Sequence, residues 1–185
     1  VIAGIFFEWY GAPRALPPSP TRRSSDLLPV TPGWGWPPRP HTPIREDEIV
    51  ATRRFEFERS GGAWVVNGEL FDPCVFNANP PKGGQERWIL KNGSGGWCHP
   101  INIHLQSHQI QKIDGKPTAE HEAAKVDTTV LGPKTEVEIF MKFRTFTGPF
   151  VFHCHNIAHE DMRMMNVFDV DGPSSESTNA TLEND

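Results

Sequence analysis

The sequence predicts an all-β protein, a sandwich or barrel built from short strands. From residue 49 onward, runs of alternating apolar residues, rich in β-branched and aromatic side chains, recur at short intervals. Between the runs stand turn-forming pairs such as Gly61-Gly62, Asn67-Gly68 and Pro80-Pro81. Evenly spaced short strands separated by such turns are typical of sandwiches and barrels.

Each strand is predicted from the period of its apolar residues and from the turn residues that bound it. In chain order the expected strands cover residues 49–57, 64–66, 86–90, 97–110, 128–131, 136–143, 150–155 and 165–170. Helix is expected only as single turns, one near residues 119–124 and one after Cys154.

The 185 residues divide into three parts by composition. Residues 1–43 are rich in proline and arginine, and residues 20–27 resemble a translated sequencing adapter, so this segment is expected to be non-globular or chimeric. Residues 44–170 have the texture of one domain, and the polar tail 171–185 is expected to be disordered. Because the chain begins with Val1 rather than Met, we expect it to be a fragment.

The charge and hydropathy of the chain exclude two classes of partner. A formal net charge of −5 argues against binding to nucleic acid. The longest apolar runs are too short to cross a bilayer, so no membrane association is expected.

The richest concentration of metal-binding side chains lies between residues 150 and 165. It contains His153, Cys154, His155, His159 and Met164, the nitrogen and sulfur ligands that copper prefers. If the strand predicted over residues 150–155 forms, Cys154 faces one side of it while His153 and His155 face the other. His159 and Met164 follow the strand and can turn back to the side of Cys154.

Two other interpretations of this segment stay open. Histidine and cysteine also bind zinc, although neighbours on opposite strand faces chelate a single ion poorly. The same side chains could instead be core residues without a metal, at the cost of desolvating several imidazoles.

A second segment supplies a further imidazole. In residues 97–105 the apolar residues alternate with polar ones, which places Asn102 and His104 on the same face of a strand. Pro100 marks the beginning of that strand, and His99 precedes it in extended geometry.

Both motifs, in this order and spacing, resemble the C-terminal copper signatures of the multicopper oxidases, and they are most similar to the laccase and bilirubin oxidase branch. The resemblance covers about residues 54–170 and implies that residues 44–170 form a Greek-key cupredoxin domain, the third domain in that family. The implied type 1 copper ligands are His99, Cys154, His159 and Met164, and the implied type 3 ligands are His104, His153 and His155.

One position departs from the family pattern. The type 2 copper ligand corresponds to position 102, where this chain has Asn102 rather than histidine. An amide oxygen is a weak copper ligand beside an imidazole, so the type 2 site is in doubt. Histidine and asparagine codons differ by a single base, and a sequencing error is an alternative explanation.

The resemblance implies an oxidoreductase that couples one-electron oxidation of a small reducing substrate, such as a phenol, bilin or metal ion, to reduction of O2 to water. Cys154 is then ligand and electron conduit, and Glu160 either delivers protons or is a solvated loop carboxylate. The other cluster ligands would come from N-terminal cupredoxin domains of the same protein. An extracellular, periplasmic, spore-surface or cell-surface location is implied by the family alone. The alternatives are a mononuclear electron-transfer cupredoxin and an inactive remnant.

Three smaller features of the sequence lie outside the two copper motifs or at their edges. Cys74 and Cys98 are candidates for one disulfide or for two small buried thiols. Asn92-Gly-Ser and Asn179-Ala-Thr fit the N-glycosylation pattern, a weak signal. His108 has no partner at ligand spacing and is expected to be structural or at the surface.

Overall fold

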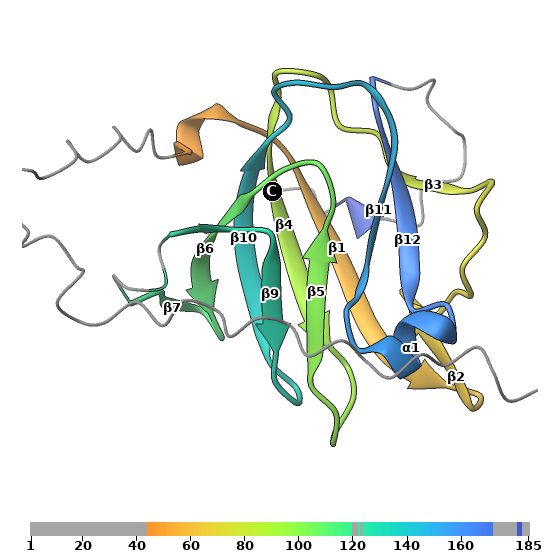
Figure 1. The fold of residues 1–185 in the computed structure, drawn as a ribbon. Coiled ribbons are helices and arrows are strands. Elements are labelled where there is room, and N and C mark those ends of the chain that lie inside the picture. Colours follow the sequence, from red (N-terminus) through yellow and green to blue (C-terminus); the bar gives the residue numbers. More distant parts are fainter. Residues whose placement is uncertain (1–43, 120–121, 123, 172–180, 183–185) are drawn as a thin grey trace, which may run out of the picture. The chain divides into compact units, whose positions relative to one another are not determined.

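The computed structural model describes residues 44–119, 122, 124–171 and 181–182, which form two β-sheets packed face to face (Figure 1). The all-β class predicted from the sequence is confirmed. The expectations for residues 1–43 lie outside the described residues. So do those for most of the tail, in which Thr181–Leu182 form a short strand, β13.

The larger sheet has eight strands. Its order is β13, β1 (Ile49–Ser60), β4 (Gln85–Asn92), β10 (Glu136–Lys142), β6 (His108–Ile113) and β7 (Lys116–Pro117), with β2 (Ala63–Val66) beside β1 and β8 (Lys125–Val126) beside β6. β1 and β4 run parallel, and β10 is antiparallel to both β4 and β6. A single 3-10 turn, Glu46–Glu48, precedes β1.

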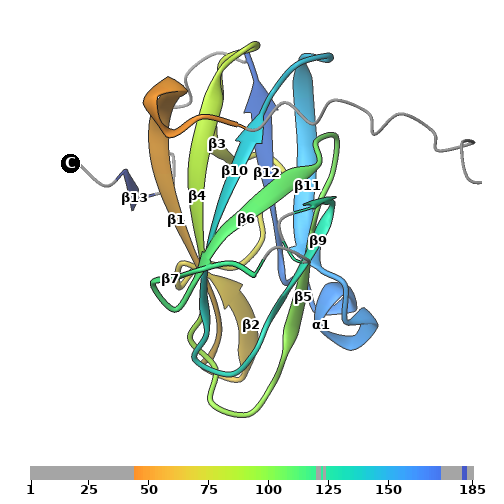
Figure 2. The same ribbon diagram turned by 90° about the vertical axis from the view of Figure 1, so that its left-hand side faces the viewer.

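The smaller sheet has five strands and carries both copper motifs. Its order is β3 (Phe76–Ala78), β12 (Met165–Val170), β11 (Gly148–Cys154), β5 (His99–Ile103) and β9 (Thr128–Leu131). The short helix α1 (Ile157–Asp161) joins β11 to β12. Figure 2, turned by 90°, shows β11, β12 and β5 forming one layer and β1, β4, β10 and β6 the other.

The core between the sheets is built around a cluster of aromatic rings. The Trp88 ring lies with its centroid 4.8 Å from that of Phe55, 5.3 Å from Phe152 and 5.7 Å from Phe168, and all four side chains are fully buried. Rings buried at these separations stabilise a core both by area and by edge-to-face contacts. The Trp88 indole N–H donates to the Glu86 carboxylate at 2.8 Å.

The expectation of one continuous strand over residues 97–110 is wrong. The chain leaves the smaller sheet after Ile103 and joins the larger sheet at His108. Leu105 has a φ of 77° at the bend between them, a conformation that L-residues with branched side chains rarely adopt. Because glycine and proline are absent from residues 101–110, the sequence carried no signal for the bend.

The remaining differences are at element ends and in short strands. The predicted bounds of 128–131 and 165–170 are those observed, and the turn expected after Cys154 is helix α1. β3, β7 and β8 were not predicted, since two or three residues carry too little periodicity. The turn expected near residues 119–124 lies partly outside the described residues. Among the residues that the structure describes, no helix has the length and apolar character needed to cross a membrane.

Candidate metal centre

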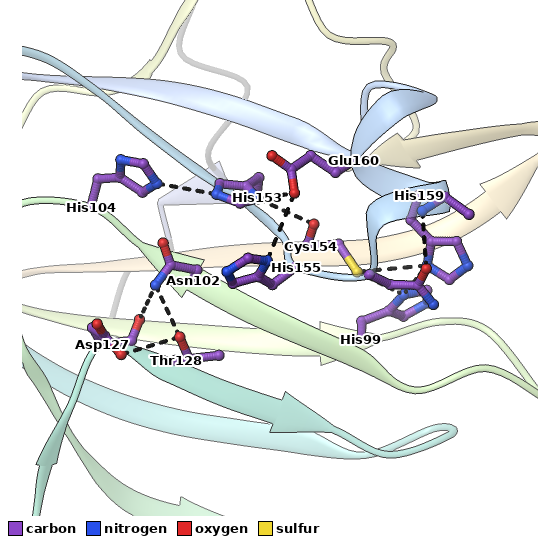
Figure 3. Close-up of polar contacts among 12 residues, drawn as sticks. His99, Asn102, His104, Asp127, Thr128, His153, Cys154, His155, His159 and Glu160 are labelled. Atoms are coloured by element: carbon purple, nitrogen blue, oxygen red, sulfur yellow. Dashed lines mark hydrogen bonds and ion pairs between the residues drawn. The ribbon is translucent and has the colours of Figure 1, made fainter. Parts of the chain in front are cut away.

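Three buried side chains meet at one end of the sandwich. His99 Nδ1 and His159 Nδ1 are 3.1 Å apart, and each lies 3.6 Å from Cys154 Sγ (Figure 3). A triangle with these sides has a circumradius of about 2.0 Å, close to the metal–nitrogen distances of about 2.0–2.1 Å found for zinc. An ion close to the plane of this triangle can therefore lie about 2.0–2.3 Å from all three donors, the range of zinc–nitrogen and zinc–sulfur bonds.

Strand register and the short helix bring these donors together. In the antiparallel pair of β11 and β5, Cys154 stands opposite Ile101, which places His99 at the same end of the sheet. Asn156 begins α1 by accepting a hydrogen bond from the Ala158 N–H at 3.2 Å, as an N-cap residue does. The helix then returns His159 to the side of Cys154.

Met164 is held beside this triangle by its main chain. Its carbonyl accepts from the Cys154 N–H at 2.9 Å, and its own N–H donates to the His159 carbonyl at 3.0 Å. The side chain is fully buried. The main chain of Met164 therefore lies beside the triangle, and a thioether together with two imidazoles and a thiol are the donor types of a blue-copper centre.

Burial sets the protonation of the three donors. Desolvation raises the pKa of the Cys154 thiol to about 11, with Glu160 contributing in the same direction, so the metal-free thiol is protonated at neutral pH. Desolvation and the neighbouring His159 lower the pKa of His99 to about 4. Desolvation also lowers the pKa of His159. The imidazoles are neutral and ready to ligate, while metal binding must displace one thiol proton.

Sequence reasoning missed the residues that hold His99 in place. Asn92 is fully buried, and its Nδ2 lies 2.7 Å from the Trp97 carbonyl and 2.9 Å from the Gly132 carbonyl. Its Oδ1 accepts from the Ser94 N–H at 2.8 Å, and Ser94 Oγ lies 3.3 Å from His99 Nε2. The Asn92-Gly-Ser triplet is therefore part of the scaffold of the site, and its buried amide is inaccessible to glycosylation in the folded chain.

Two tryptophans cover the site. The Trp64 ring, from β2, lies against the ring of His159 with centroids 3.9 Å apart and is buried. The Trp97 ring is 5.3 Å from that of His159 and 53% exposed. The imidazole of His159 is buried beside these two indoles, and no sequence motif pointed to Trp64.

A second group of donors lies on the opposite face of the smaller sheet. His104 Nε2 and His153 Nε2 are 3.1 Å apart (Figure 3). His153 Nδ1 lies 3.1 Å from the carbonyl oxygen of Cys154, which accepts its hydrogen bond. This bond fixes the tautomer and leaves Nε2 with an unprotonated lone pair, which faces His104 Nε2. Burial and His153 lower the pKa of His104, which keeps its imidazole neutral.

His155 and Glu160 stand beside this pair. The ring centroid of His155 is 5.4 Å from that of His153, and the side chain is 59% exposed. Glu160 Oε2 lies 3.4 Å from His153 Nδ1 and 3.8 Å from His155 Nδ1. Cys154 thus faces the buried triangle while its two neighbours face the other group, so the two sets of donors are one residue apart.

Asn102 lies on this same face but its amide nitrogen is turned away from the histidines. Its Nδ2 donates to Thr128 Oγ1 at 2.9 Å and to the Asp127 carbonyl at 3.2 Å. The only atom of Asn102 left to ligate a metal is therefore its amide oxygen. This oxygen is a weaker ligand for a type 2 copper than an imidazole nitrogen.

The remaining candidates lie apart from both groups. Cys74 and Cys98 are exposed free thiols, so the structure contains no disulfide between them and the alternative of two buried thiols is wrong. His108 is fully buried, and its Nε2 lies 2.6 Å from Thr129 Oγ1, which makes it a link between the two sheets. The alternative placement of His108 at the surface is thus wrong.

Two packed sheets with a buried His-Cys-His triangle at one end define a cupredoxin-like domain with a site that resembles a type 1 copper centre. Residues 38–174 match the family model described as multicopper oxidase. The chain belongs to the multicopper oxidase family.

Individual relatives agree with this assignment. The chain is 36% identical to a bilirubin oxidase of Albifimbria verrucaria over 136 residues, which are 70% of this chain and 24% of the relative. It is 36% identical to a laccase of Haloferax volcanii over 118 residues, 62% of this chain and 20% of the relative. A crystal structure of laccase from Pediococcus acidilactici shares the fold with a TM-score of 0.63 at 24% identity, over 71% of this chain and 28% of that one. The chain therefore spans about a quarter of the length of these proteins.

Proposed function

We propose that residues 44–170 are the copper-binding C-terminal cupredoxin domain of a laccase-like multicopper oxidase. The enzyme would couple one-electron oxidation of a reducing substrate, such as a phenol, bilin or metal ion, to reduction of O2 to water. One observation carries the proposal: Cys154 Sγ and two imidazole Nδ1 atoms form a buried triangle with sides of 3.1 to 3.6 Å. Bound copper would supply the one-electron redox chemistry.

Cys154 connects the two groups of donors. Its thiol faces His99 and His159, and its carbonyl accepts a hydrogen bond from His153 at 3.1 Å. An electron that arrives at the thiolate therefore has both a covalent and a hydrogen-bonded route to the imidazole of His153. Cys154 acts as ligand and conduit in this proposal and not as a nucleophile.

Glu160 is the residue that we propose delivers protons. Reduction of O2 to two water molecules consumes four electrons and four protons, and those protons come from solvent. The Glu160 side chain is 34% exposed and lies within 3.8 Å of both His153 and His155, so it reaches solvent and the second group at once. A carboxylate in that position can pass protons between them.

The second group needs histidines from another domain. Within the described residues it offers His104, His153 and His155, and an O2-reducing copper cluster requires more imidazoles than these. We propose that a partner cupredoxin domain of the same protein contributes them, in agreement with the matched region making up only 24% and 20% of these two relatives.

A mononuclear electron-transfer protein is the alternative from another class. It would use the buried triangle alone. The pairing of His104 Nε2 with His153 Nε2 at 3.1 Å on the opposite face disfavours this reading, since an electron-transfer domain has no use for it.

Copper loading of the purified chain tests the proposal. The folded chain should develop an intense thiolate-to-copper band in the red, and Cys154→Ser should abolish that band while the chain stays folded by circular dichroism. A folded, copper-loaded chain without the band would contradict the assignment. Oxygen uptake with a phenolic donor should be absent for the 185-residue chain alone, and catalytic uptake would show that a partner domain is not needed.

A further inference from the structure

Asn102 stands where the family places a type 2 copper ligand, and the structure shows what this side chain does instead. The residue lies in β5 between two neighbours: His153 of β11 is its register partner on one side and Thr128 of β9 on the other. Directly paired residues project to the same face of a sheet. The amide of Asn102 therefore lies between the candidate copper ligand His153 and strand β9.

The hydrogen bonds determine which end of the amide faces which neighbour. Nδ2 lies 2.9 Å from Thr128 Oγ1 and 3.2 Å from the Asp127 carbonyl oxygen. A main-chain carbonyl only accepts hydrogen bonds, so the group that faces Asp127 must be the NH2 end. If the amide were reversed, two carbonyl oxygens would face each other. The orientation is thus fixed by Asp127 and not by the hydroxyl of Thr128, which can donate or accept.

As a consequence the amide oxygen faces the histidines. In Figure 3 the oxygen of Asn102 points to the side of His104 and His153, away from β9. This oxygen ends nearer to the backbone than the Nε2 atom of an imidazole at the same position would. Asn102 therefore offers the group of His104, His153 and His155 only one weak oxygen ligand, carried on a short side chain.

We propose that Asn102 is a clamp between β5 and β9 and that the copper cluster of this protein lacks a type 2 ion. The inference rests on the proposed function, in which a partner cupredoxin domain completes the cluster. The histidine pair His104 and His153 retains its ligating geometry, because its 3.1 Å contact does not involve position 102. The protein would hold the paired copper ions and the type 1 copper without the third member of the cluster.

The clamp can be tested in the metal-free 185-residue chain. NMR should show the side-chain NH2 of Asn102 protected from hydrogen exchange, and Thr128→Val, which keeps the shape but removes Oγ1, should reduce that protection. Exchange of the Asn102 NH2 at the rate of an exposed amide in the unchanged chain would overturn the clamp.

The missing copper can be tested in the protein expressed with its partner cupredoxin domain. After copper loading, the unchanged protein should show the red band and no type 2 EPR signal, and Asn102→His should bind one more copper ion and gain that signal. Asn102, His104 and Asp127 border an open pocket of about 310 Å³, so the side chain at position 102 is not enclosed on every side. Thr128→Val serves as the control that loosens the clamp without adding an imidazole, and it should gain no copper.

The outcomes separate the two proposals. A type 2 signal in the unchanged protein, or an unchanged copper count in Asn102→His, would overturn the inference while the red band upholds the proposed function. Absence of the red band from every version would contradict the proposed function itself.

Discussion

Replacement of Asn92 by alanine should destabilise the chain more than any other single change near the triangle. The Asn92 side chain is fully buried, with Nδ2 near the carbonyls of Trp97, Leu131 and Gly132 at 2.7, 3.2 and 2.9 Å. Its two amide protons can make two good hydrogen bonds, and Oδ1 accepts a third from Ser94. At about 1 kcal/mol net for each bond, Asn92→Ala should lower the free energy of unfolding by about 3 kcal/mol.

Urea unfolding of the metal-free chain, followed by tryptophan fluorescence, measures this loss. Ser94→Ala is the matched control, because it keeps the main-chain N–H that bonds Asn92 and removes only the hydroxyl near His99. It should cost about 1 kcal/mol or less.

The Asn92→Ala variant also tests the link between this hydrogen-bond network and the metal site. If Asn92 positions the segment before His99, copper-loaded Asn92→Ala should show a shifted or weakened red band even where the chain remains folded. A loss of stability below about 1 kcal/mol, or one equal to that of Ser94→Ala, would refute the reasoning, since each lost bond should count separately.

Three further outcomes follow from the structure. Arg53→Met should destabilise the chain by about 3–5 kcal/mol, because it leaves the carboxylate of Glu86, whose side chain is 0% exposed, without its ion-pair partner at 2.8 Å. Chemical denaturation measures the loss, and adding Glu86→Gln, which removes the charge but still accepts from the Trp88 indole N–H, should recover much of it. Burial lowers the pKa of His108 from 6.5 to about 4, so the stability gained from burying the neutral imidazole is fully present above pH 6.5 and is lost as the pH falls towards 4, up to roughly 3 kcal/mol. Denaturation at several pH values should therefore show a smaller loss of stability in acid for His108→Phe than for the unchanged chain, and identical profiles would contradict this. Met164→Leu should keep the red band of the copper-loaded chain and raise its reduction potential in voltammetry, because a weak axial thioether is removed; an unchanged potential would place Met164 outside the site.

The sequence by itself determined the fold class and the family. Alternating strands with turn pairs predicted the all-β sandwich, and strands over 128–131 and 165–170 were located to the residue. The close spacing of His153, Cys154, His155 and His159 also sufficed to predict that the cysteine and its neighbours face opposite sides. Such features are local, because strand periodicity and short ligand spacing depend only on adjacent residues.

The tertiary structure decided what depends on distant contacts. Leu105 takes a φ of 77° and carries the chain from one sheet to the other, which alternation in the sequence does not reveal. Trp64 lies against His159 and Asn92 holds the segment before His99 only because separate strands are brought together. The sequence identified Asn102 as an exception to the family pattern, but its amide is oriented by Asp127 of another segment, 25 residues away. A hydrogen bond between strands is fixed by their register, and register is a property of the assembled sheet.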